Sequence, residues 1–527
     1  MTRFPAICLI VLSLAAPAAG QGPQRAFQYY VETHPILTLP NAAVLSTLDE
    51  ESISMADLSF SKENGKLIPI EGSDDCWKAM ARTESFKRVS ERMSVHGNLS
   101  YTHFRGQDMG GQVLINPANS PINFLEEDYS ARGVKKRESY SLTGDLGYSL
   151  SDIVSIGTRL GYTSADQVKY KDPRFQNIWM DMSVCPGVFF RVSDYFSIGA
   201  YLEYRQTLEK INAGLYGTVD HDYYMLTDLG GFYGPRERFE GDIGYISVSN
   251  ERPLSNSCYG LSVQTVAGRG RQWTGLLTAL WRDGYFGNRS SSSVVFCEFG
   301  GPEVSFKGTM LLPTDKNIHL FSVDASYGLL NNYSNSYKHE TQIGMSDKIV
   351  YLGQTRILAR NDINATFSYS FFGDTGGYLP KWELKAAANT FCRLQSTTIY
   401  PFSRDWTSIS VNISVAAGHN LVQGKNIYSC HLSAGFFTGF GEPRADISDA
   451  TGSSKLKSFD SYSDLQFEYE TASRSKVGLE LKYTRLVPGR FVPYIKLSDS
   501  FDSLLSDPQY LDGKTRNIAA ITLGCNF

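Results

Sequence analysis

The sequence has little of what marks the commoner classes of protein. After the first 20 residues, no apolar run reaches the roughly 18–20 residues that a membrane-spanning helix needs. The formal net charge is only −4 over 527 residues, so the chain has no positive excess with which to bind nucleic acid. If the chain crosses a membrane, it has to do so as a closed β-barrel, the other fold that pairs every backbone polar group in lipid.

Cysteine is also scarce, and its spacing indicates no site. Cys8 lies in the leader, and the other seven cysteines are scattered without any Cys-x-x-Cys pair. An odd, scattered set indicates neither a disulfide framework nor a zinc site. We expect no cofactor, and interpret the cysteines as small apolar residues on strand faces.

The first 20 residues are typical of a secretory signal peptide. Arg3 supplies the positive charge, Ala6–Ala16 the apolar core, and Ala16–Gly20 the small residues for cleavage. We therefore expect residues 1–20 to be removed after export.

The strongest positive signal is an alternation of apolar and polar residues. In Asn517–Phe527 the odd positions are mostly apolar and the even positions small or polar. The same period of two predicts a hairpin over Asp464–Arg485 with a turn at Ser473–Ser475. Because side chains alternate between the two faces of a strand, each such strand has one apolar and one polar face.

Connections between these strands alternate in length, as in outer-membrane barrels. Tight turns are expected near 151–152, 193–194, 268–270, 313–316, 374–380, 419–425 and 473–475, and long loops at 105–137, 163–177, 205–253, 328–360, 442–462 and 487–514. The prediction is an all-β transmembrane antiparallel barrel of about 16 strands, with 14 or 18 as alternatives. Residues 91–527 form the barrel, and residues 21–90 form a periplasmic or lumen segment that could add one or two strands.

Three short segments resemble a known family. They are Val95–Tyr101, Asp172–Asn177 and Leu523–Phe527, and they resemble the uncharacterised outer-membrane barrel proteins of the Bacteroidetes. The resemblance covers nearly the whole mature chain. It implies a barrel in the outer membrane of a Gram-negative bacterium and is nearly silent on function. A broader similarity to outer-membrane transport barrels rests on architecture alone.

Two more specific functions are not favoured. Glu32–Ile36 faintly resembles a TonB coupling box, but too few residues precede the first clear strand for a folded plug domain. His431 and Ser433 have the spacing of an outer-membrane phospholipase pair, and an i, i+2 pair shares one strand face. However, Ala434 replaces the asparagine of that family, and the alternation sends the pair into the lumen rather than toward lipid. We expect no enzyme.

Metal binding by the loops is a further alternative. Asp220–Asp222 and Glu126–Asp128 are acidic clusters within expected loops. Consecutive residues of a strand point to opposite sides, so neither cluster would converge on an ion without a turn. Solvated loop charge is the favoured interpretation.

The candidate binding residues fall in the lumen and in the long loops. The hairpin predicts lumen charges at Glu468, Glu470, Glu480, Lys476 and Lys482, and Arg174 is a further candidate. The 205–253 loop is rich in glycine and in aromatic residues, among them Tyr216, Tyr223, Tyr224 and Tyr233. Such a loop is expected to fold into the barrel mouth as a lid or to dock a partner protein.

The favoured function is therefore a barrel that passes or binds a small solute without coupled chemistry. Outer-membrane lipid and that solute are the expected partners. The alternative is an accessory barrel that docks a transporter, a surface lipoprotein or a secretion machine. A lipid hydrolase is the least favoured of the three.

Overall fold

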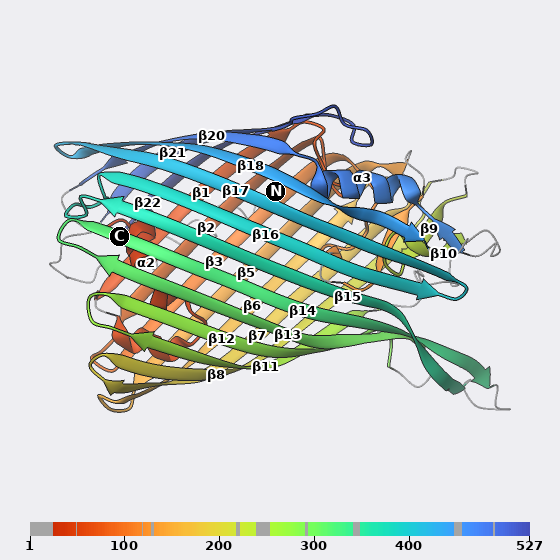
Figure 1. Cartoon of the computed structure of the whole chain (residues 1–527), viewed down its shortest axis with the longest axis horizontal. Helices are drawn as coiled ribbons and strands as arrows, with labels where there is room; N and C mark the ends of the chain where they lie inside the picture. The colour runs from red at the N-terminus through yellow and green to blue at the C-terminus, as the bar shows by residue number, and fades with distance from the viewer. Residues whose placement is uncertain are drawn as a thin grey trace.

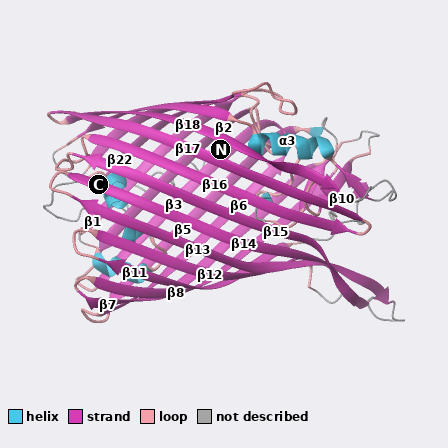
Figure 2. Ribbon diagram, in the orientation of Figure 1, coloured by secondary structure: helices cyan, strands magenta, loops and turns pink. Residues whose placement is uncertain are grey.

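The chain forms a closed antiparallel barrel with smaller elements inside its two ends (Figure 1 and Figure 2). The computed structural model describes residues 25–48, 50–117, 120–127, 131–217, 222–238, 253–289, 293–340, 348–446, 456–487 and 491–527. The barrel strands are β1 (Ser52–Asn64), β2 (Asp75–Arg88), β3 (Met93–Met109), β5 (Gly133–Ser149), β6 (Val154–Lys169), β7 (Arg174–Ser193), β8 (Phe196–Gly214), β11 (Leu254–Ala267), β12 (Gln272–Gly287), β13 (Val295–Pro313), β14 (Asn317–Glu340), β15 (Lys348–Gly373), β16 (Trp382–Ile399), β17 (Phe402–Gln423), β18 (Asn426–Asp446), β20 (Arg474–Arg485), β21 (Val492–Leu504) and β22 (Thr515–Asn526).

The barrel has 18 strands, so the main prediction of about 16 is wrong and the alternative of 18 is confirmed. Two of these strands, β1 and β2, precede residue 91. β1 pairs with β2 on one side and with β22 on the other, which closes the barrel. Across that closure Leu58 lies opposite Leu523 and Phe60 opposite Ile521. Without β1, the edge of β22 would remain unpaired.

The hairpin expected over Asp464–Arg485 is wrong in its first half. That half is α3 (Asp460–Thr471), and β20 pairs instead with β18 and β21. Leu465 and Tyr469 are four residues apart, so they share one face of a helix as well as one face of a strand. They pack against Leu67, Leu504 and Leu511, and this packing selects the helix.

The two ends of the barrel differ. One end, the short-turn end, carries connections such as 150–153, 268–271 and 424–425, together with the C-terminus and α2 (Phe27–Thr33) (Figure 1). The other, the long-loop end, carries α3 and a four-stranded sheet. The strands of that sheet are β4 (Asn123–Glu126), β9 (Tyr224–Asp228), β10 (Tyr233–Arg238) and β19 (Leu456–Ser458).

Several connections differ from expectation; the loop expected at 487–514, for example, contains the whole of β21. Residues 473–475 lie at the long-loop end, because β20 starts there after α3. Most of 163–177 is strand, because β6 and β7 extend to Lys169 and from Arg174. Most of 328–360 is also strand, because β14 and β15 continue to pair out to Glu340 and Lys348 as a projecting hairpin (Figure 1).

The outer face of the barrel is apolar and the inner face is largely polar. Large apolar side chains are exposed all around it, including Leu142 (54%), Leu277 (53%), Trp281 (57%), Leu432 (60%) and Leu523 (53%). An exposed apolar surface of this extent marks a surface that water does not cover in the working state. Within the described ranges, no helix combines the length and apolarity needed to span a membrane.

Candidate ligand chamber inside the barrel

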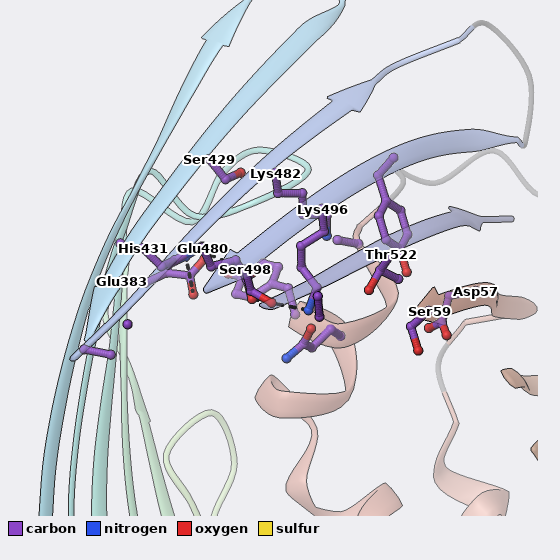
Figure 3. Close-up of a pocket in the computed structure, with 18 of the residues that line it drawn as sticks. Asp57, Ser59, Glu383, Ser429, His431, Glu480, Lys482, Lys496, Ser498 and Thr522 are labelled. Carbon is purple, nitrogen blue, oxygen red and sulfur yellow. Dashed lines mark ion pairs between the residues drawn. The ribbon is translucent and has the colours of Figure 1, made fainter. Parts of the chain in front are cut away.

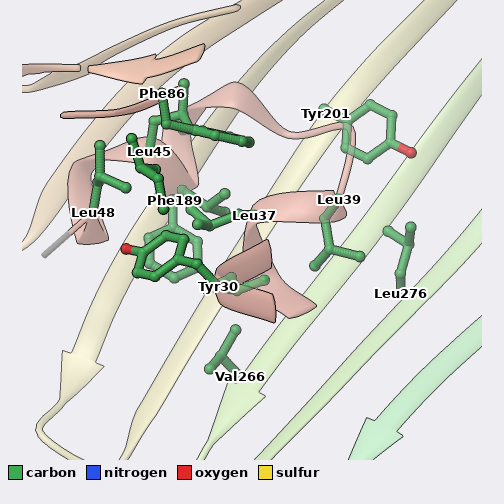
Figure 4. Close-up of a cluster of buried hydrophobic side chains, with 14 of the residues drawn as sticks. Tyr30, Leu37, Leu39, Leu45, Leu48, Phe86, Phe189, Tyr201, Val266 and Leu276 are labelled. Carbon is green, nitrogen blue, oxygen red and sulfur yellow. The ribbon is translucent and has the colours of Figure 1, made fainter. Parts of the chain in front are cut away.

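Residues 26–48, here called the N-terminal plug, lie inside the short-turn end of the barrel. The plug consists of α2 and two 3-10 helices, Pro35–Thr38 and Ala42–Thr47. Its apolar side chains pack against inward-facing wall residues (Figure 4). The labelled members are Tyr30, Leu37, Leu39, Leu45 and Leu48 of the plug and Phe86, Phe189, Tyr201, Val266 and Leu276 of the wall. This is a dry core inside an otherwise polar lumen, so the plug has a fixed position.

Polar contacts fix the register of the plug. Asn41 donates from Nδ2 to the carbonyl of Val188 (3.0 Å), and its Oδ1 accepts from the Ala43 amide (3.1 Å). Glu32 is paired with Lys385 on β16 at 2.9 Å. The plug therefore contacts opposite parts of the wall.

Glycines on the wall allow the plug to approach closely. A Cβ on Gly157 of β6 would lie 2.3 Å from the Ala43 nitrogen, and one on Gly187 of β7 would lie 2.4 Å from Asn41 Oδ1. Real Cβ atoms essentially never come this close, so only glycine fits. The sequence of the wall is thus matched to the backbone of the plug.

A chain of ion pairs runs along the wall beside the plug. His96 contacts Asp145 (2.9 Å) and Glu84 (3.1 Å), and Arg159 makes a two-pronged contact with Asp145 at 2.7 Å. Phe86 stacks on His96 with ring centroids 4.2 Å apart. Because buried charges need partners, this network keeps the polar wall compatible with the apolar plug.

The long-loop end also holds a second inserted unit. The small sheet and α3, here called the cap, fold over and into the barrel mouth. Val113, Ile122 and Phe124 of the β3–β5 connection pack against wall residues Phe175 and Phe286. Glu126 of β4 forms a buried ion pair with Lys169 of β6. Burial raises the pKa of Glu126, and the pairing with Lys169 opposes that shift.

One arginine joins the parts of the cap. Arg404 of β17 is 2% exposed and contacts Asp446 through Nε (2.7 Å) and Nη2 (2.9 Å). It also donates to the Gly231 carbonyl (2.9 Å) and to Ser458 Oγ (2.8 Å). The wall, the β9–β10 turn and β19 therefore meet at a single side chain.

Asp228 holds the β9–β10 turn through backbone amides. Its Oδ1 accepts from Gly230 (2.8 Å) and Tyr233 (3.3 Å). Burial raises the pKa of Asp228 to about 6 from its usual 3.8. A raised carboxyl pKa means that the closed cap binds a proton more tightly than the opened cap.

The contribution of Asp228 to the stability of the closed cap is therefore greatest below about pH 3.8, falls as the pH rises to about 6, and is constant above that. Asp228→Asn keeps an acceptor oxygen but no charge. We expect amide exchange at Gly230 and Tyr233 to be slower in the variant than in the wild type above pH 6, with the difference vanishing below pH 4. Comparison at each pH cancels the intrinsic exchange rate, and a difference that is independent of pH would contradict the assignment.

Inside the barrel, next to the plug, lies a chamber of about 1040 Å³ that is lined by plug and wall residues (Figure 3). Among the described residues its lining carries carboxylates at Glu32, Asp57, Glu63, Glu84, Glu383, Glu480 and Asp499, and cations at Lys78, Arg82, Lys385, Lys482 and Lys496. His431 lies between two of the carboxylates, with Nε2 3.5 Å from Glu383 and Nδ1 3.9 Å from Glu480. Lys496 pairs with Glu480 at 3.3 Å. The mixed signs suit a small solute that bears several polar groups.

The candidate lumen residues separate into two groups. Glu480 and Lys482 line the chamber, and Lys476 lies on the same face of β20 but outside the lining. Glu468 and Glu470 do not line the chamber, because they belong to α3. Glu468 accepts from the backbone amides of residues 509–511 at 2.6–2.8 Å, which ties α3 to the β21–β22 connection.

The loop candidates lie at the rim and in the cap. Arg174 pairs with Asp172 (3.0 Å) and lies over the ring of Tyr216, which is 72% exposed. Tyr224 stacks under Arg236 at 3.5 Å. Tyr223 packs against the apolar cluster of the cap, and Tyr233 is fully buried against Phe402. None of them reaches the chamber lining.

The structure also shows where the phospholipase-like pair, the segment that resembles a TonB box and the acidic clusters lie. His431 and Ser433 both line the chamber and so face the lumen, as expected. Glu32–Ile36 is part of the plug. Of the two acidic clusters, residues 220–221 and 128 lie outside the described residues. Glu126 is already paired with Lys169. No group of three or more potential metal ligands occurs in the part of the chain that the structure describes.

Sequence reasoning missed the residues that hold the plug and the cap. Asn41 and Lys385, which contact the plug and the wall, and Arg404, which joins the parts of the cap, were not candidates, and neither was Glu383, which lines the chamber. The alternation of apolar and polar residues does place the side chains of Glu383, Lys385 and Arg404 on the lumen side of their strands. It does not say which inserted segment each of them meets.

The fold and the chamber define a closed β-barrel whose two ends are occupied by its own chain. The model of the family of unknown function DUF6850 matches residues 42–527, so the chain belongs to that family. No curated protein sequence matches the chain.

Solved structures with a similar arrangement are distant. The ferric preacinetobactin receptor BauA from Acinetobacter baumannii is 8% identical, with 91% of this chain and 80% of that chain covered, at a TM-score of 0.38. A Pseudomonas aeruginosa FadL homologue is 10% identical, with 92% of each chain covered, at a TM-score of 0.33. The copper transporter OprC is 10% identical, with 90% and 80% covered, at a TM-score of 0.39. Similarity at this level carries no argument about what this chain binds.

Proposed function

We propose that this protein is an outer-membrane barrel that admits a small polar solute to the chamber next to the plug, without converting it chemically. The observation that carries the proposal is the contrast between the two faces of one closed sheet. The outer face exposes apolar side chains such as Leu277 and Leu432, and the inner face encloses a chamber of mixed charge. A lipid environment outside and water inside account for both faces.

The size and charge of the chamber support a small solute rather than a polymer. Its volume of about 1040 Å³ is close to that of ordinary small-molecule sites. Acidic and basic groups alternate along its lining, for example Glu480 beside Lys496. A lining with both signs suits solutes that carry both donors and acceptors.

Reconstitution into lipid vesicles tests the proposal. The protein should require detergent for purification, and it should insert into vesicles and let small polar solutes escape from them. Vesicles that hold heat-denatured protein are the control for leakage. A chain that stays monodisperse in buffer without detergent, or intact barrels that release nothing, would contradict it.

A second function, docking of a partner protein, is favoured by one observation. The β14–β15 hairpin projects beyond the rim and ends in a ladder that includes Tyr337 opposite Tyr351 (Figure 1). Next to it, Leu352 is 64% exposed. Intact barrels that conduct nothing but retain a stoichiometric partner during purification would favour docking over passage. Shortening the hairpin should then release the partner.

A further inference from the structure

A second, smaller cavity lies in the long-loop end, between the wall and the cap. Its volume is about 140 Å³, and it shares no lining residue with the chamber. We call it the rim cavity. Its polar lining includes Glu71 and Gln112 from connections of the barrel, Arg360 and Arg393 from β15 and β16, and Gln466 and Glu470 from α3.

The two arginines of the rim cavity are paired with carboxylates. Asp362 lies between the two arginines, with Oδ2 3.2 Å from Arg360 Nε and Oδ1 2.8 Å from Arg393 Nε. Glu470 adds a favourable electrostatic contact to Arg393. Burial raises the pKa of Glu71, and a hydroxyl group can meet either form of this carboxyl, because a hydroxyl both donates and accepts.

Two side-chain oxygens in the rim cavity lack hydrogen-bond partners within the described part of the chain. Glu71 Oε2 and Gln112 Oε1 are both shielded from solvent, and neither has a hydrogen-bond partner among the described residues. Gln112 as a whole is only 8% exposed. A buried acceptor without a partner costs free energy, so two of them in one cavity indicate a place for donors from outside.

One side of the rim cavity is aromatic. Trp406 and Phe232 both line it, with ring centroids 5.7 Å apart. Arg360 Nη1 already donates to the Ser120 carbonyl (3.2 Å), which fixes the guanidinium against the loop. The cavity thus combines fixed donors, free acceptors and an apolar surface.

We propose that the rim cavity binds a neutral polyhydroxylated molecule of about the size of a hexose. Each hydroxyl can both donate and accept, so it can donate to Glu71 Oε2 or Gln112 Oε1 and accept from a guanidinium N–H. The C–H face of such a molecule packs on an aromatic ring such as that of Trp406. A volume of about 140 Å³ has room for roughly ten water molecules, enough for one such ring and not for a chain. The inference goes beyond the proposed function, because the rim cavity is a separate site.

Binding to the full-length protein in detergent tests the inference. D-glucose, D-galactose and myo-inositol would be titrated by calorimetry, with saturation-transfer NMR as a second readout, and serine would serve as a zwitterionic probe. At least one polyol should bind with a millimolar Kd. Glu71→Ala and Gln112→Ala should each weaken that binding about tenfold, because each removes one acceptor. Asp507→Ala, which removes an exposed carboxylate of another connection, is the matched control and should bind as the wild type does.

Several results would overturn the inference. Binding of serine and of no polyol would mean a zwitterion site, and binding of none of the probes would mean a cavity that holds water only. Polyol binding that survives both substitutions would place the site elsewhere. Retention of the compact, unheated band on a gel shows that each variant still folds. Vesicle permeability is a separate measurement, so a barrel that passes solutes but binds no polyol contradicts only this inference.

Discussion

Gly157→Val should displace the N-terminal plug and turn the narrow passage beside it into a wide conducting pore. The first added carbon would lie 2.3 Å from the Ala43 nitrogen and 2.5 Å from the Ala42 carbonyl carbon. The wall strand β6 pairs along its length with β5 and β7, so the wall is held on both sides. The plug is held by two apolar clusters, by side-chain contacts and by a backbone hydrogen bond from Ala26 to Tyr378, rather than by strand pairing, so it is the part that gives way.

Single-channel recording in planar bilayers measures the effect. An empty barrel of 16–18 strands leaves an aqueous channel, so we expect conductance to rise about tenfold or more. Gly435→Val is the matched control, because its added carbon meets nothing closer than 3.5 Å on the same inner face. Conductance should not change in that variant.

A deletion variant tests the same prediction without adding a side chain to the wall. Deletion of residues 26–48, with the leader kept, removes the plug without touching the wall, and it should open the pore to the same extent. If both altered proteins form heat-modifiable barrels and conduct no more than the wild type, the plug is not what restricts passage through the lumen. The cap would then be the remaining barrier.

Much of the barrel could be read from the sequence because its physical cause is local. A period of two follows directly from strand geometry, and the outer surface requires it in nearly every strand. The failures occur where a segment has two compatible periods. Leu465 and Tyr469 fit a strand or a helix equally well, and only their neighbours Leu67 and Leu511, distant in sequence, decide between them.

The chamber and its closures were predictable only in part. Alternation placed Glu480 and Lys482 in the lumen, because that needs only the local pattern. It could not show that Glu32 meets Lys385, a contact across 353 positions. Pairings of this kind depend on the rolled shape of the whole sheet, and a single sequence carries no local sign of them.

Arg404→Ala should open the cap. Removing a partner from a buried ion pair typically costs ~3–5 kcal/mol. Asp446 and Asp460 are 38% and 50% exposed, so water replaces part of what they lose, and we expect about 3 kcal/mol, at the lower end of that range. The Gly231 carbonyl and Ser458 also lose their donor. The rings of Tyr233 and Phe402 lose the cation that lies 5.8 Å and 5.4 Å from their centroids.

Hydrogen exchange resolved by peptide measures the opening. Protection in residues 222–238 and 456–471 should fall about a hundredfold, which is the equivalent of 3 kcal/mol. Protection of the barrel strands at the short-turn end should not change. Arg404→Lys keeps the charge but not the two-pronged geometry, so it should fall between the alanine variant and the wild type.

The matched control is an arginine pair at the opposite end of the barrel. Arg269 and Asp194 are 3.2 Å apart but 65% and 66% exposed, and exposed pairs contribute little because water screens them. Arg269→Ala should leave the exchange of the cap as it is. If Arg404→Ala does the same, the cap is held by its apolar contacts, such as Trp406 on Phe232, and the arginine only satisfies the charges around it.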